Sequence, residues 1–142
     1  MNSIVRVILA IVVGIVLGGV VNMGLILLGP SIIPPPPGVD MSSAESMAAS
    51  MHLFKPQHLL FPFLAHALGT LAGAIAAYWL AGTRQLFAAY VIGVVFLLGG
   101  IAATFMIPAP LWFILLDLGF AYMPMAWLGT KLGQRLLSYD TS

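Results

Sequence analysis

The sequence predicts an all-α integral membrane protein, a four-transmembrane-helix bundle with a short external amphipathic helix. Of its 142 residues, 61% are hydrophobic and only 6% are charged. Soluble domains carry about 25% charged residues, so this chain could not cover a surface that faces water. Four apolar stretches each reach the roughly 20 residues that cross the hydrocarbon core. We therefore expect a single membrane domain over residues 1–142, in contact with the lipid bilayer.

The first span is predicted over residues 4–29 and ends at Pro30. Gly14 and Gly18 form a G-x-x-x-G pair, the spacing that lets two membrane helices approach closely. Asn22 follows one turn later on the same face, because residues four apart share a helix face. We expect Asn22 to point inward, toward another helix.

Residues 30–56 are expected to form an external loop. Four consecutive prolines, 34–37, favour a stiff polyproline segment that cannot be helical. The pattern S-x-x-E at residues 42–45 is a capping box that opens a helix over residues 43–54. Met47, Met51 and Phe54 share one face of it, which predicts an amphipathic helix on the membrane surface.

Three further spans are predicted over residues 57–81, 86–107 and 111–132, followed by a cytoplasmic tail over residues 133–142. Pro62 falls in the first turns of its span, where a proline costs least, and Pro124 should kink the last span. The glycines expected at close helix contacts, within the chain and with other chains, are Gly14, Gly18, Gly69, Gly73, Gly93 and Gly100.

The basic residues predict the orientation. Arg6, Arg84, Lys131 and Arg135 fall on one side of the four spans, and only Lys55 falls on the other. Cytoplasmic loops carry the excess of Lys and Arg, so both termini should be cytoplasmic. The formal net charge of +1 provides no basic surface for nucleic acid.

The first and third spans share a pattern that predicts an internal duplication of two hairpins. Residues 12–23 and 91–106 both carry V-x-G, then L-G-G, then a polar residue and Met. Two hairpins that enter the membrane the same way would be a parallel repeat. The competing interpretation is that membrane helices rich in Gly and Val resemble one another through composition alone.

An intramembrane polar cluster is the main candidate site. At 1.5 Å per residue, Asn22 and Asp117 lie ~10 Å below the outer ends of their helices and His66 lies ~13 Å below its own. Ionisable groups at such depths are expensive and mark functional sites. Thr70 lies one turn deeper, and His58 could admit protons or a cation from outside. The competing interpretation is a polar contact that only fixes helix register.

Chemistry of other kinds has weaker support. Met47, Met51, His52 and His58 lie within one external segment, and thioether and imidazole ligands suit Cu(I). Methionines at helical spacing are more often the apolar face of a surface helix. Patterns for a nucleophile or a phosphate loop are absent from the sequence. Below Thr70, Tyr122 is the only polar candidate. We expect no enzyme activity and no cofactor.

Two segments carry a resemblance. MHLFKPQHLLFPFLAHALGTLAGA (residues 51–74) and PAPLWFILLDLGFAYMPMAWLG (residues 108–129) resemble a group of small bacterial four-helix membrane proteins with no established activity. The resemblance covers most of the chain and implies a bacterial inner-membrane location, with nothing about mechanism. Patterns typical of a fluoride channel or a small multidrug exporter are not found.

Two functions remain open from the sequence. The first is a non-enzymatic scaffold or accessory subunit, a homo-oligomer or part of a larger membrane complex, whose His66–Asp117–Asn22 cluster locks helix packing. The second is a small transporter or channel that uses His66 and Asp117 to handle protons or a cation. They differ in one feature, because transport needs a cavity that reaches His66 and a lock needs a dry contact.

Overall fold

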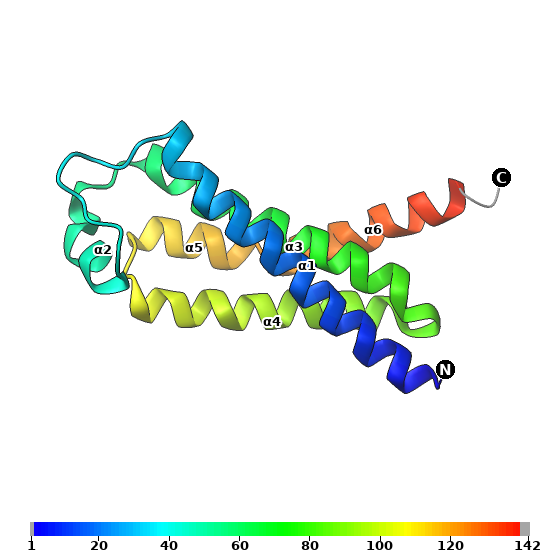
Figure 1. Ribbon diagram of the computed structural model, residues 1–142. Helices are drawn as coiled ribbons and strands as arrows, with labels where there is room; N and C mark the ends of the chain where they lie inside the picture. The colour runs from blue at the N-terminus through cyan, green and yellow to red at the C-terminus, as the bar shows by residue number, and fades with distance from the viewer. Residues whose placement is uncertain (1, 140–142) are drawn as a thin grey trace.

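The computed structural model describes residues 2–139, and in that range every regular element is a helix. The long helices are α1 (Ser3–Ile32), α3 (Leu60–Ala81), α4 (Gln85–Met106), α5 (Leu111–Phe120) and α6 (Met123–Tyr139). They lie side by side as an elongated bundle in which α5 and α6 together make the fourth rod (Figure 1). The all-helical prediction is confirmed.

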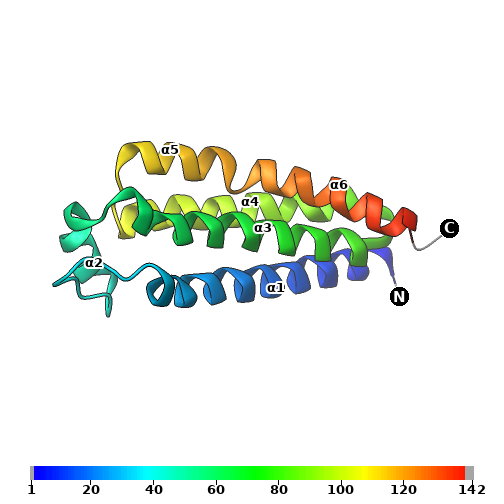
Figure 2. The ribbon, with the colours of Figure 1, turned by 90° about the horizontal axis from the view of Figure 1, so that it is seen from above.

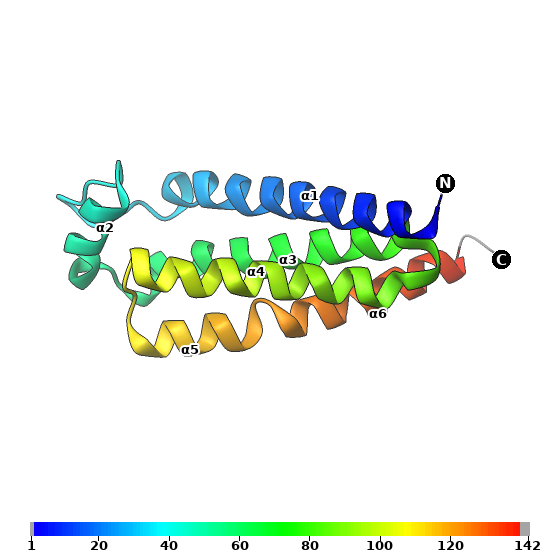
Figure 3. The same cartoon turned by 90° about the horizontal axis from the view of Figure 1, so that it is seen from below.

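Three stretches are long and apolar enough to cross a membrane by length and composition, namely Ser3–Ile32, Pro56–Met106 and Leu111–Tyr139. The middle stretch contains both α3 and α4, which the short 3-10 helix η3 (Gly82–Arg84) joins into an antiparallel pair. Helix α1 lies on one side of this pair and the α5–α6 rod lies on the other (Figures 2 and 3). Helix α3 contacts α1, α4 and α6, so it is the centre of the bundle.

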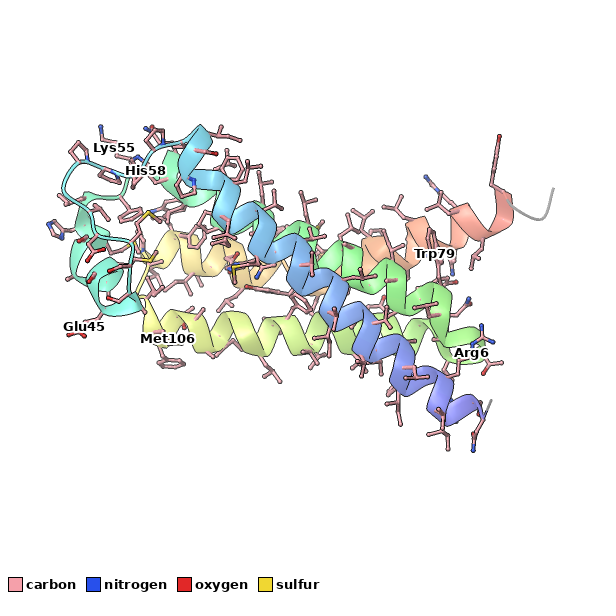
Figure 4. The ribbon with its side chains drawn as sticks, viewed as in Figure 1. Arg6, Glu45, Lys55, His58, Trp79 and Met106 are labelled. Atoms are coloured by element: carbon pink, nitrogen blue, oxygen red, sulfur yellow. The ribbon has the colours of Figure 1, made fainter. Side chains whose placement is uncertain are left out.

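The end of the bundle opposite the long loop is held by Arg6. Its Nε donates a hydrogen bond of 2.8 Å to the backbone oxygen of Leu80, near the end of α3. The next turn requires Gly82, which has a φ of 74° and packs against the Arg6 side chain. Arg6 and Trp79 lie toward this end, and His58 and Lys55 lie at the loop end (Figure 4).

Helix α1 continues past the residue at which it was expected to stop. Pro30 lies inside its last turn, and the helix ends at Ile32. Pro34 explains the later end, because the residue before a proline is driven out of the helical region. Ile33 is extended, with φ −119° and ψ 93°, and its N–H still donates a hydrogen bond to the backbone oxygen of Gly29.

The external loop contains a shorter helix than predicted. Helix α2 spans Ala44–Ser50, and the 3-10 helix η1 (Met51–Leu53) continues it. Its N-cap is Ser43, whose hydroxyl accepts from the N–H of Ser46, whereas Ser42 donates its N–H to Asp40. The capping residue is therefore one position later than the S-x-x-E pattern indicates. A second 3-10 helix, η2 (Pro56–Leu59), leads into α3.

The last predicted helix is broken. Residues 111–132 were expected to form one kinked span, but α5 ends at Phe120 and α6 begins at Met123. Pro124 is the cause, because its ring would clash with the carbonyl of Phe120 four residues earlier in a continuous helix. Helix α6 extends to Tyr139, so most of the expected tail is helical, and residues 140–142 lie outside the described range.

The predicted packing glycines are used inside this chain. A Cβ on Gly18 would lie 2.6 Å from the oxygen of Gly69, and one on Gly14 would lie 2.7 Å from the oxygen of Gly73. Gly93 faces Ala126 in the same way, and Gly100 faces the Tyr122 ring. Contact with other chains is therefore not what these glycines require. The α1–α3 contact is glycine against glycine, whereas Gly93 of α4 meets Ala126 of α6. The duplication stays a prediction.

Candidate functional site

The site is built on a hydrogen-bonded His–Asp pair between α3 and α5. His66 Nδ1 lies 2.8 Å from Asp117 Oδ1 and 3.0 Å from Oδ2. The Asp117 side chain is 5% exposed, whereas the His66 side chain is 23% exposed. The two residues are 51 positions apart in the chain, and the sequence places them at one depth because both lie two turns or so inside their helices. The predicted meeting of His66 and Asp117 is present in the structure.

Tyr122 is the third member of this cluster, and the sequence did not assign it there. Its hydroxyl donates a 3.0 Å hydrogen bond to Asp117 Oδ2, and its ring stacks on His66 with 5.7 Å between centroids. In an unbroken helix, residues five apart point roughly 140° away from each other. The break between α5 and α6 lets Tyr122 turn back toward Asp117, and Gly100 leaves room for its ring. Pro124 was the only signal in the sequence.

Two predicted members of the cluster have other roles. The side-chain oxygen of Asn22 is buried without a hydrogen-bond partner, and Asn22 packs against Gly69 instead of bonding to His66 or Asp117. The Thr70 hydroxyl donates 2.7 Å to the backbone oxygen of His66 within α3. A threonine hydroxyl in a helix commonly bonds the backbone carbonyl one turn back. Thr70 therefore bonds neither the His66 side chain nor Asp117.

A cavity of about 300 Å³ lies above the pair at the loop end of the bundle. Its walls come from the external loop and from the ends of α1, α3, α4 and α5. His66 and Asp117 both line it, and the wall is otherwise almost wholly apolar. The polar side chains that line it are His58, His66, Thr104 and Asp117. Its volume is at the lower end of the range for small-molecule pockets.

The bundle is closed on the other side of His66. One to two turns further along α3, Gly69 and Gly73 touch the backbone of α1. A Cβ on Gly129 of α6 would lie 2.8 Å from the Cβ of Ala74, so α1 and α6 both pack closely against α3. The cavity is consequently one-sided: it extends from the external loop and ends at the His66–Asp117 pair.

The external residues considered for a metal fall into two groups. Met47, Met51 and His58 line the cavity, and His52 is exposed and does not. His58 Nδ1 accepts from the N–H of Lys55, which commits that nitrogen to the cap of η2. No group of three or more His, Cys, Asp or Glu side chains that could hold a metal ion occurs among residues 2–139.

Comparison with known proteins supplies no relative. A scan against protein-family models finds no match to this chain, and searches of curated proteins and of solved structures find none either.

Proposed function

We propose that this chain is a bacterial inner-membrane protein of four spans that binds a small, mostly apolar molecule in its one-sided cavity. The polar end of the molecule would contact His66, which Asp117 and Tyr122 hold in place. Three stretches are apolar and long enough to cross a membrane, and the basic residues near the end opposite the loop support cytoplasmic termini. The resemblance of residues 51–74 and 108–129 to small bacterial membrane proteins supports the same location.

The observation that carries the proposal is the cavity that ends at an ionisable pair. A contact that only fixed helix register would be packed on all sides, because an empty space next to it forfeits dispersion contacts. Here about 300 Å³ adjoins His66 and Asp117. Ligand pockets in proteins are mainly apolar with a few placed polar groups, which is the composition of this wall.

Conduction of an ion through the bundle has less support. An ion needs polar or charged groups along its whole path, since unpaired charge is costly in the hydrocarbon region. The cavity wall offers four polar side chains, and the packing of Gly69, Gly73 and Gly129 closes the bundle beyond them. Binding from one side is therefore the function that the geometry favours.

The test uses single cysteines, because the natural sequence has none. Ile114 lines the cavity one turn from Asp117, and its neighbour Leu115 is 65% exposed on the outer side of α5. In membrane vesicles, we expect a small impermeant thiol reagent added on the loop side to label Ile114→Cys. Leu115→Cys, at the same depth but facing lipid, should stay unlabelled. Equal protection of both positions would contradict the proposal. It would favour a dry contact between His66 and Asp117 that only fixes helix register.

A further inference from the structure

The charge of the cavity indicates which ligands it can accept. Asp117 Oδ2 accepts a hydrogen bond from the Tyr122 hydroxyl, and His66 Nδ1 lies 2.8 Å from Asp117 Oδ1. An ionised carboxylate can only accept, so Nδ1 is the donor to an ionised Asp117. The proton between His66 and Asp117 is then on Nδ1, as assigned from this network. Neither Lys nor Arg occurs among the residues that line the cavity. The floor therefore presents the Asp117 carboxyl with no Lys or Arg beside it.

The second ring nitrogen of His66 is the group left for a ligand. Within residues 2–139, Nε2 has no hydrogen-bond partner, while Nδ1 is held by Asp117. In the neutral imidazole with its proton on Nδ1, Nε2 carries a lone pair and accepts a hydrogen bond. The floor therefore presents an acceptor backed by a carboxylate, which fits a cationic N–H group and repels an anion.

The walls also favour a cation with an apolar body. Phe54, Phe61 and Phe113 line the cavity, and aromatic rings attract ammonium groups through their faces. Between residues 33 and 59, Asp40 and Glu45 outnumber Lys55. Hydrogen bonds from Ser42 hold the pKa of the Asp40 carboxyl below its usual value. Negative charge in the external loop raises the local concentration of cations there.

We propose that the ligand is a small lipophilic amine, bound as its ammonium ion with an N–H group directed at His66 Nε2 and with Asp117 supplying the counter-charge. The inference rests on the proposed function, because it names the class of molecule for the same cavity. A volume of about 300 Å³ holds one ring with a short chain and excludes a two-chain lipid.

Three probes of matched shape separate charge from apolar fit: phenylbutylamine, phenylbutanol and phenylbutyrate. Binding of each radiolabelled probe would be measured by scintillation proximity on the full chain in phosphatidylcholine nanodiscs, with protein-free nanodiscs as the blank. We expect the amine to bind about tenfold more tightly than the alcohol, and the carboxylate to bind most weakly, because hydrogen bonds to charged groups are the stronger ones. Asp117→Asn should remove the preference for the amine over the alcohol.

Two tryptophan variants locate the binding. Ala103 lines the cavity, whereas its neighbour Ala102 is exposed on the outer side of α4. We expect Ala103→Trp to abolish amine binding and Ala102→Trp to leave it unchanged. A wild-type protein that binds the alcohol as tightly as the amine overturns the amine assignment while the cavity remains a binding site. Absence of saturable amine binding also overturns it, and labelling of Ile114→Cys then decides separately whether the cavity is open.

Discussion

Asp117 is the residue that organises the site, because it holds two partners from different parts of the bundle. One carboxylate oxygen accepts a hydrogen bond from the Tyr122 hydroxyl, and both oxygens lie within 3.0 Å of His66 Nδ1. A buried carboxylate needs such partners, since leaving it unpaired is strongly destabilising. The result is an imidazole fixed at one nitrogen and available at the other.

Replacing Tyr122 by phenylalanine tests the value of its hydrogen bond. Tyr122→Phe keeps the ring that stacks on His66 and removes the hydroxyl that bonds Asp117. We expect the free energy of unfolding to fall by about 0.6–1.7 kcal/mol, the range for interhelical hydrogen bonds in membranes. Unfolding titrations in mild detergent would measure it, with Tyr90→Phe on α4 as the control. An unchanged stability would show that the hydroxyl does not bond Asp117.

The sequence predicted the two ionisable residues and missed their third partner for a physical reason. Membrane-depth His and Asp are conspicuous because each costs free energy without a partner. Asn22 was expected to join them because the three lie at one depth, but depth fixes only one coordinate. The rotation of α1 that packs Gly18 against Gly69 places Asn22 beside Gly69.

At the scale of the elements, glycine contacts determine how α1 meets α3. Helices α1 and α3 run antiparallel, so Gly14 meets Gly73 and Gly18 meets Gly69. Such close backbone approach supplies the dispersion contacts that hold membrane helices together. The G-x-x-x-G patterns predicted that these faces pack, but a single sequence could not say whether their partner was in the same chain.

Adjacent glycines on α1 provide a matched test of this contact. A Cβ on Gly18 would lie 2.6 Å from the Gly69 oxygen, and a Cβ on Gly19 has nothing within 4 Å. We expect Gly18→Ala to lower the free energy of unfolding by about 1–3 kcal/mol, as overpacking does. Gly19→Ala should be neutral or stabilise by up to about 1 kcal/mol, because alanine favours a helix. Equal effects of the two substitutions in the same detergent titration would contradict the packing.

Helix ends and breaks were predicted less well than helix existence. Pro30 was expected to end α1, but it lies inside the last turn, and Pro34 sets the actual end by restricting Ile33. Pro124 was expected to kink one helix and instead separates α5 from α6. The break matters for the site because it places Tyr122.

At the scale of the whole molecule, the bundle is asymmetric along its length. Small residues close the end near Arg6, and the loop end retains a cavity between the helices. The lengths of the apolar stretches predicted the all-helical class, which the structure confirms for residues 2–139. The cavity could not be predicted, because it depends on how α2, η1 and η2 lie over the ends of the long helices.

Whether the cavity reaches His66 can be measured by its reaction with diethyl pyrocarbonate, a small apolar reagent that modifies accessible imidazole nitrogens. In a His52→Gln, His58→Gln background, His66 is the only histidine left. Mass spectrometry of the intact protein in membranes should find His66 modified. Ala103→Trp should slow the reaction about tenfold or more, because it fills the cavity, and Ala102→Trp should not. If His66 reacts only after unfolding, the cavity does not open to it and the account is wrong.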